Sequence, residues 1–74
     1  MKWVVVHDGW HEGHYEGYFR TYYVRPGYFS DRECKKMSWI RAKLIAREYP
    51  KSTTFSSDRY FVKRAEEVDN VCSN

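Results

Sequence analysis

Metal binding is the first chemistry that the residue types suggest, because three histidines alternate with three carboxylates near the N-terminus. The six candidate ligands for zinc or nickel are His7, Asp8, His11, Glu12, His14 and Glu16. Offsets of four and three residues bring imidazoles together on a helix, but the glycines at positions 9, 13 and 17 disfavour a helix there. We therefore predict no metal and no other cofactor, and we expect His7, His11 and His14 to face solvent and make the loop pH-sensitive.

Catalysis has little support in the residue pattern. The sequence contains no Gly-rich phosphate-binding loop, no nucleophile elbow and no pair of helix-borne metal ligands. A nucleophilic Cys34 assisted by a histidine is the one arrangement that spacing alone leaves open. Because 74 residues leave little room for a pocket that buries a substrate, we expect a non-enzymatic protein.

Positive charge is concentrated in the middle of the chain. Residues 18–64 carry a net charge of +8, whereas the segments before and after them are acidic. Four of these cations are spaced four, seven and four residues apart, so that they would share one side of a helix: Arg32, Lys36, Lys43 and Arg47. This basic strip predicts an acidic partner, either nucleic acid or a protein surface, and the alternative is an ordinary solvated helix face.

Aromatic residues form the second group of candidate binding residues. From position 7 the chain repeats a four-residue unit, HDGW, HEGH and YEGY, in which an acid and a glycine lie between two rings. Trp10 and Tyr15 would be rigid anchors in such a loop, which is typical of a protein-contact element. The alternative is a loop folded over the sheet edge with Trp10 in the core. Tyr22 or Tyr23, on the next predicted strand, could stack on a nucleic-acid base.

One long helix is predicted to position the basic strip, from about residue 30 to residue 49. Ser30 and Glu33 have the spacing of a capping box, and Pro50 ends the helix at Tyr49. At about 100° per residue, the apolar residues form a wide arc suited to packing on a sheet. This arc contains Cys34, Met37, Trp39, Ile40, Ala42, Leu44, Ile45, Ala46 and Tyr49.

The rest of the chain is predicted to form a small antiparallel sheet. Strands are expected at residues 2–7, 17–25, 53–55 and 59–64. The unbroken valine run of the first strand indicates a central position buried on both faces. The order is β-β-α-β-β, and the predicted fold class is an α+β two-layer sandwich with the helix packed on one face.

Two connections complete this prediction. Pro26-Gly27 is expected to form a type II turn that leads into the helix, with Phe29 as a hydrophobic staple before Ser30. After the last strand, a short helical turn or a frayed tail is expected from Ala65; the alternative is a second helix that begins at Ser57.

The chain is predicted to form a single domain, residues 1–74, with an acidic tail at about 66–74 that is frayed or briefly helical. The apolar run after Lys2 is too short for a signal peptide or a membrane span. We expect Cys34 and Cys72 to be free thiols in a reducing cytoplasm, which is the host cytoplasm for a phage-encoded protein. A monomer or small homo-oligomer is expected.

The first half of the chain is similar to the N-terminal halves of HicB-type antitoxins in the order of its elements. The segments MKWVVVHDG, EGYFRTYYV and GYFSDRE correspond in kind to the first strand, the second strand and the helix start of that family. The family's Leu-Pro-Gly-Cys turn and Glu-Glu-Ala-Leu helix start are absent here. The resemblance therefore implies a strand-loop-strand-helix layout and transfers no function.

Together these features predict a small non-catalytic protein-binding module that inhibits or modulates a larger nucleic-acid-processing or defence complex. A single domain of this form is typical of phage-encoded inhibitors, such as anti-defence or anti-CRISPR proteins and polymerase inhibitors. The alternative is a protein that binds nucleic acid directly through the basic strip and the sheet aromatics. The residues predicted to contact the partner are Trp10, Tyr15, Tyr22, Arg32, Lys36, Lys43 and Arg47.

Overall fold

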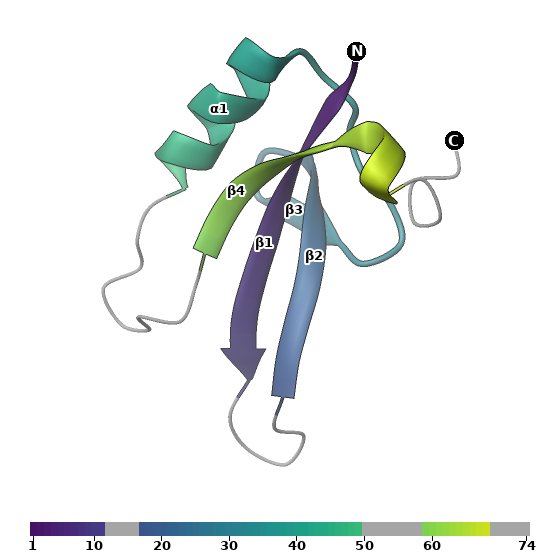
Figure 1. Ribbon diagram of the computed structural model, residues 1–74. Helices are drawn as coiled ribbons and strands as arrows, with labels where there is room; N and C mark the ends of the chain where they lie inside the picture. The colour runs from purple at the N-terminus through teal and green to yellow at the C-terminus, as the bar shows by residue number, and fades with distance from the viewer. Residues whose placement is uncertain (12–16, 50–58, 69–74) are drawn as a thin grey trace.

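A computed structural model of the chain describes residues 1–11, 17–49 and 59–68. In chain order, the elements of these ranges are β1 (Trp3–His11), β2 (Gly17–Arg25), β3 (Tyr28–Ser30), α1 (Trp39–Glu48), β4 (Arg59–Arg64) and the 3-10 helix η1 (Ala65–Val68). The strands form one antiparallel sheet in the order β3-β2-β1-β4, with α1 lying beside β4 and β1 (Figure 1). The predicted α+β class is confirmed.

The central strand is β1, as its valine run predicts. Val4, Val5 and Val6 are each 0% exposed because β1 has a strand on either side and apolar side chains over both faces. The strand is longer than the predicted 2–7, since residues from Asp8 to His11 continue the ladder with β2 despite Gly9. Part of the glycine-rich stretch is therefore sheet.

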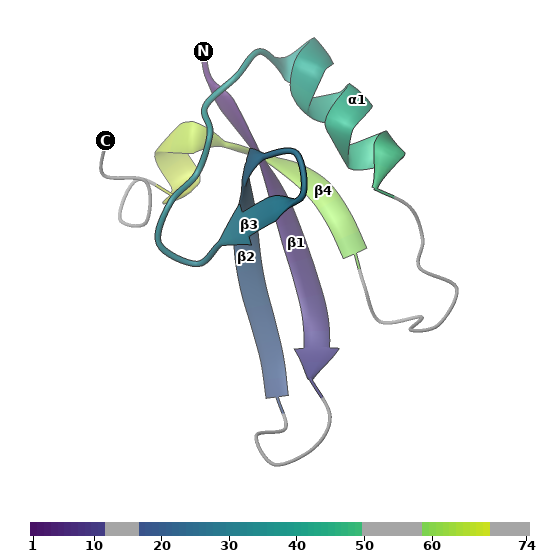
Figure 2. The same cartoon turned by 180° about the vertical axis from the view of Figure 1, so that it is seen from behind.

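Two apolar clusters cover the two faces of the sheet. The helix-side core consists of Val5, Tyr23, Met37, Ala42 and Ile45. The far-side core, on the opposite face, consists of Val4, Val6, Tyr22, Cys34, Ala65 and Val68. Adjacent strand residues point to opposite faces, which explains why neighbours such as Tyr22 and Tyr23 fall in different clusters. The predicted helix layer therefore covers one face, and η1 with the segment around Cys34 covers part of the other. Figure 2 shows from behind the chain between β3 and α1 passing beside η1.

The predicted Pro26-Gly27 turn is present, but it does not lead into the helix. Gly27 has φ +78°, the left-handed conformation that the third residue of a type II turn requires. The turn closes a hairpin between β2 and β3, an element that the sequence prediction missed. Phe29 lies in β3 and contacts the Tyr23 and Tyr49 rings edge-on, so its predicted role as a hydrophobic staple is wrong.

The predicted helix start is also wrong, because α1 begins at Trp39 and the preceding residues extend the sheet. The N–H of Lys35 donates to the Tyr23 carbonyl at 2.8 Å, and Met37 exchanges two backbone hydrogen bonds with Trp3 at 2.7 and 2.8 Å. These bonds hold the backbone in an extended conformation. The hydroxyl of Ser30 accepts from the N–H of Arg32 at 3.0 Å, a local turn in place of the predicted capping box.

The C-terminal part agrees better with the sequence prediction. β4 spans Arg59–Arg64 as predicted, and η1 provides the short helical turn expected from Ala65. The alternative of one continuous helix from Ser57 is wrong, because residues 59–64 are paired with β1. The predicted strand at 53–55 and most of the tail lie outside the described residues. Within those residues the order is β-β-β-α-β.

Cys34 lies in the far-side core and is disulfide-bonded, so its prediction as a free thiol is wrong. It is not on a helix and is 7% exposed. The other cysteine of the chain, Cys72, lies outside the described residues. Among the helices of the described ranges, none has the length and apolar character needed to cross a lipid bilayer.

Candidate protein-interaction surface

The orientation of α1 follows from the cap at each end. The hydroxyl of Ser38 accepts from the N–H of Arg41 at 3.3 Å, and the N–H of Tyr49 donates to the Ile45 carbonyl at 3.2 Å. Ala42 is 0% and Ile45 9% exposed, so the side of the helix that contains them faces the sheet. The helical period then determines which residues of α1 lie on the side that faces away from the sheet.

That outward side contains an apolar pair with cations around it. We define the outward strip as Ile40, Lys43, Leu44 and Arg47, which have the i, i+3, i+4, i+7 spacing of one helix face. Ile40 is 68% exposed and Leu44 54% exposed, although both were predicted to pack on the sheet. The correction follows from the later helix start and from the burial of Ala42 and Ile45, which rotates Ile40 and Leu44 toward solvent.

Three cations on α1 are exposed around this pair: Arg41, Lys43 and Arg47. The Lys43 amine lies 5.5 Å from the ring centroid of Trp39, which is itself 49% exposed. Glu48 is the single acid on the helix. The resulting surface has an apolar centre and a positive border, which complements an apolar patch bordered by carboxylates.

A groove runs along the same side of the molecule, between α1 and β4. Its volume is about 340 Å³, and it is lined from α1 by Trp39, Lys43, Ala46 and Arg47 and from β4 by Tyr60, Phe61 and Val62. Lys43 and Arg47 therefore border both the outward strip and the groove. The two features form one continuous region on the α1 and β4 side of the protein.

The four cations predicted to form one basic strip do not share a helix face. Lys43 and Arg47 are on α1, where they belong to the outward strip. Arg32 lies in the segment before the helix, fully in solvent, with its guanidinium 3.9 Å from the Asp31 carboxylate. Lys36 is half-buried near the N-terminus. The helix start at Trp39 is the reason for this separation.

The aromatic residues predicted to contact a partner are also distributed differently. Trp10 is in β1 opposite Tyr18 of β2, and its backbone alone is described. Tyr15 lies outside the described residues. Tyr22 and Tyr23 are each 7% exposed and belong to the two cores, which leaves neither ring exposed for stacking on a base. The exposed rings on β2 are those of Tyr18, at 83%, and Phe19, at 37%.

The histidines have different surroundings. His7 is half-buried, not facing solvent as predicted, and its ring stacks on Tyr60 with centroids 4.4 Å apart and contacts Phe19 and Phe29 edge-on. The hydroxyl of Thr21 lies 3.4 Å from its Nδ1 atom. His11 is the last residue of β1, and His14 lies outside the described residues. In the described part of the chain, no three His, Cys, Asp or Glu side chains are grouped as a metal site would need.

An ion pair lies on the far face of the sheet, between Asp8 of β1 and Arg20 of β2. Arg20 donates two hydrogen bonds to the Asp8 carboxylate, at 2.6 and 2.8 Å, and its guanidinium lies 5.5 Å from the Phe61 ring centroid. The hydrogen bond from Arg20 is the main reason why the pKa of Asp8 lies below its usual value. Arg20 is thus engaged within the protein.

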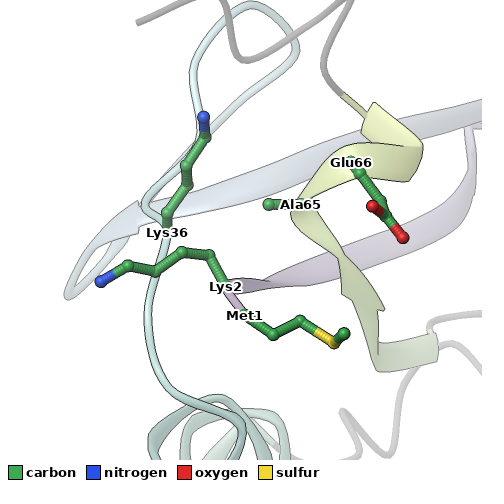
Figure 3. Close-up of a pocket in the computed structure, with 5 residues that line it drawn as sticks. All are labelled: Met1, Lys2, Lys36, Ala65 and Glu66. Carbon is green, nitrogen blue, oxygen red and sulfur yellow. The ribbon is translucent and has the colours of Figure 1, made fainter.

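A second crevice, of about 430 Å³, lies between the N-terminus and η1 (Figure 3). It is lined by Met1, Lys2, Lys36, Ala65 and Glu66. Figure 3 shows the amino groups of Lys2 and Lys36 and the carboxylate of Glu66 pointing in different directions. Because no charged groups converge there, it has less of the character of a binding site than the α1 and β4 region.

Comparisons with protein-family models, with curated proteins and with solved structures found no match for this chain. The functional assignment therefore depends on the geometry described above. Two main residues of the outward strip, Ile40 and Leu44, were missed as binding residues because the sequence prediction placed them in the core. The signal that could have found them is Ser38, an N-cap residue directly before the run WIRAKLIARE.

Proposed function

We propose that this protein is a non-catalytic protein-binding module that attaches to a larger partner through the outward strip of α1. The observation that carries the proposal is the exposure of Ile40 and Leu44 side by side on a helix that faces the sheet through the buried residues Ala42 and Ile45. Helices that bind in a groove present apolar residues at this i, i+4 spacing. The partner site that fits is an apolar groove bordered by carboxylates, because Arg41, Lys43 and Arg47 surround the pair.

Several features favour a protein partner over nucleic acid. Exposed aliphatic side chains such as Ile40 and Leu44 gain affinity from burial against apolar groups, which a phosphate backbone does not offer. The two rings that the sequence predicts for base stacking, Tyr22 and Tyr23, are buried. Arg20 and Arg64 are engaged with Asp8 and Glu66, at 2.6 and 3.6 Å. Direct nucleic-acid binding is therefore the second candidate.

A module of this size would act by occupying a surface of its partner. We infer that it inhibits or modulates a larger protein or complex, with a nucleic-acid-processing or defence complex as the class that its charge fits. Such machines have acidic regions that a basic surface can approach through electrostatic steering. This mode of action needs one copy of the protein per site and no chemical step.

The test compares two double variants of the tagged protein. In Ile40→Gln/Leu44→Gln the apolar pair is replaced without a change in charge, and glutamine is a good helix former. In the control, Arg32→Gln/Lys35→Gln, two exposed cations outside α1 are replaced. The wild type and each variant are used to retain partners from a lysate that is divided into a nuclease-treated and an untreated half. The affinity for the retained protein is then measured by calorimetry with purified components.

We expect the wild type and the control to retain the same partner in a stoichiometric complex. The Ile40→Gln/Leu44→Gln variant should bind that partner at least about tenfold more weakly. Equal retention by all three proteins would contradict the assignment of the outward strip. Retention that disappears after nuclease treatment would favour the nucleic-acid alternative.

A further inference from the structure

β4 forms one edge of the sheet as it is described, and the direction of its backbone groups can be worked out from one hydrogen bond. The N–H of Ala65 donates to the Lys2 carbonyl at 2.9 Å, in register with the β1 and β4 pairs. In an antiparallel ladder, hydrogen-bonded and non-hydrogen-bonded pairs alternate. Phe61 and Lys63 therefore direct their N–H and C=O groups toward β1, whereas Val62 and Arg64 direct theirs toward the open edge.

A second hydrogen bond agrees with this alternation. The N–H of Arg64 donates to the Glu67 carboxylate at 3.1 Å, a contact that is possible only if this N–H points away from β1. The contact also covers the edge at the C-terminal end of the strand. The N–H and C=O of Val62 lie before that cover, at the middle of the edge and beside the groove.

The groove has the right position for a side chain of an added strand. Residues directly opposite each other in an antiparallel pair point to the same face of the sheet. Val62 packs against the helix-side core, so a residue paired with it would point toward α1. There it would enter the groove against Trp39 and Ala46, where an apolar side chain fits.

In the added strand, the residues before and after the one that pairs with Val62 would point to the opposite face of the sheet, away from α1. On that face β4 carries Arg59, Phe61 and Lys63. Glutamate or aspartate opposite Arg59 and Lys63 would lie beside these cations, and the position between those two lies opposite Phe61. Lys43 and Arg47, at the border of the groove, add to the positive potential. The edge therefore fits a segment in which acidic and apolar residues alternate.

A second copy of this chain fits the same edge poorly. An antiparallel β4 to β4 contact would place six cations on one short pair of strands, Arg59, Lys63 and Arg64 of each copy. Like charges opposite each other are destabilising, and charged edge residues are a common device against self-association.

We propose that the β4 edge and the adjacent groove bind an extended acidic segment of a partner protein by antiparallel strand addition. The segment's backbone pairs with Val62, its apolar side chain enters the groove beside Trp39, and its acidic side chains face Arg59 and Lys63. This is the recognition mode of domains that take up a peptide between an edge strand and a helix. The site is separate from the apolar pair Ile40 and Leu44, so the inference does not depend on the proposed function.

The probe is a fluorescein-labelled heptapeptide in which glutamate and valine alternate, with valine at the second, fourth and sixth positions. Binding to the full chain is followed by fluorescence anisotropy. A matched peptide with lysine in place of every glutamate tests charge. Two further peptides test backbone pairing: one is N-methylated on the valines, whose amides should pair with β4, and the other on the internal glutamates, whose amides should point to solvent.

We expect saturable binding of the glutamate-valine peptide and of its N-methylglutamate form. The N-methylvaline form and the lysine peptide should bind at least about tenfold more weakly, through lost backbone hydrogen bonds and charge repulsion. No binding of the parent peptide, or equal binding of the two N-methylated peptides, would overturn the proposal.

Two variants make the same test on the protein. Val62→Pro removes the edge N–H without breaking a hydrogen bond to β1, and Val62→Ala keeps that N–H while also removing side-chain volume. Val62→Pro should bind the peptide at least about fivefold more weakly than Val62→Ala. Equal affinities in two folded variants would overturn the proposal, and the peptide series decides if Val62→Pro does not fold. The Ile40→Gln/Leu44→Gln variant should bind the peptide like the wild type, which separates this inference from the proposed function.

Discussion

Two neighbouring residues of α1 provide the sharpest test of its orientation. Ile45 is 9% exposed in the helix-side core, whereas Leu44 is 54% exposed on the outward strip. Replacing a buried aliphatic residue with alanine costs about 2–5 kcal/mol, and the lower half of that range suits the small core of a domain of this size. We therefore expect Ile45→Ala to lower the free energy of unfolding by about 2–3 kcal/mol. Leu44→Ala should change it by no more than about 0.5 kcal/mol, since alanine also favours the helix.

The assay is urea denaturation followed by circular dichroism and tryptophan fluorescence, with the m-value compared among the three proteins. Net stability of a domain this small is expected to be a few kcal/mol, so Ile45→Ala should be partly unfolded even without urea. A Leu44→Ala cost equal to that of Ile45→Ala would refute the orientation of α1. It would restore Leu44 to the core and remove the basis of the proposed binding surface.

Three further predictions concern the helix cap, an ion pair and the disulfide. Ser38→Ala should destabilise the protein by about 1 kcal/mol in the same assay, whereas Ser30→Ala, the cap predicted from sequence, should cost less than about 0.5 kcal/mol; the reverse order would place the helix start at Ser30. The lowered pKa of Asp8 means that its pair with Arg20 contributes stability above the usual value of 3.8, and that this contribution is lost as the pH falls through the lower pKa of the folded state. Asp8→Asn should therefore cost up to about 1 kcal/mol at pH 6 and much less near pH 2, and an equal cost at both pH values would contradict this. Reduction of the disulfide at Cys34 with dithiothreitol should lower the free energy of unfolding by about 2–4 kcal/mol, and an unchanged denaturation midpoint would contradict this prediction.

The parts of the fold that were predictable from sequence are those in which local pattern and tertiary environment agree. The run Val4-Val5-Val6 has strong β propensity and no polar face, so burial on both sides is the arrangement that satisfies it. Pro26-Gly27 fixes a turn wherever it occurs between two strands. The strand Arg59–Arg64 is bounded by turn signals and rich in β formers.

The start of α1 was not predictable in the same way, because two serines compete for the role of N-cap. Ser30 has a glutamate three residues later and Ser38 does not, so the local rule favours Ser30. Long-range pairing determines where the helix begins. The backbones of Lys35 and Met37 form hydrogen bonds with those of Tyr23 and Trp3, which come from distant parts of the chain. Tertiary hydrogen bonds of this kind override local helix signals.

The error at the helix start carried over to the candidate site. A twenty-residue helix offers a broad apolar arc, in which Ile40 and Leu44 have a place beside Met37 and Cys34. With α1 restricted to Trp39–Glu48, Met37 and Cys34 enter the cores from extended backbone. The helix side is filled by Ala42 and Ile45, with Ala46 and Tyr49 packed against them. The apolar residues of the predicted arc are thus divided between the two cores and the exposed surface, where Ile40 and Leu44 lie.

The two proposed contact surfaces share their cations, and this determines which experiments can separate them. Lys43 and Arg47 border the outward strip and also line the groove beside β4, so replacing them would weaken a helix-face complex and an added strand alike. Salt dependence has the same ambiguity, because both modes use the same positive potential. The features that are not shared are uncharged: the Ile40 and Leu44 side chains on one surface and the Val62 amide on the other. A partner that loses affinity with the glutamine variant and with Val62→Pro uses both surfaces, and the coupling between the two changes would then measure how far one bound segment extends across α1 and β4.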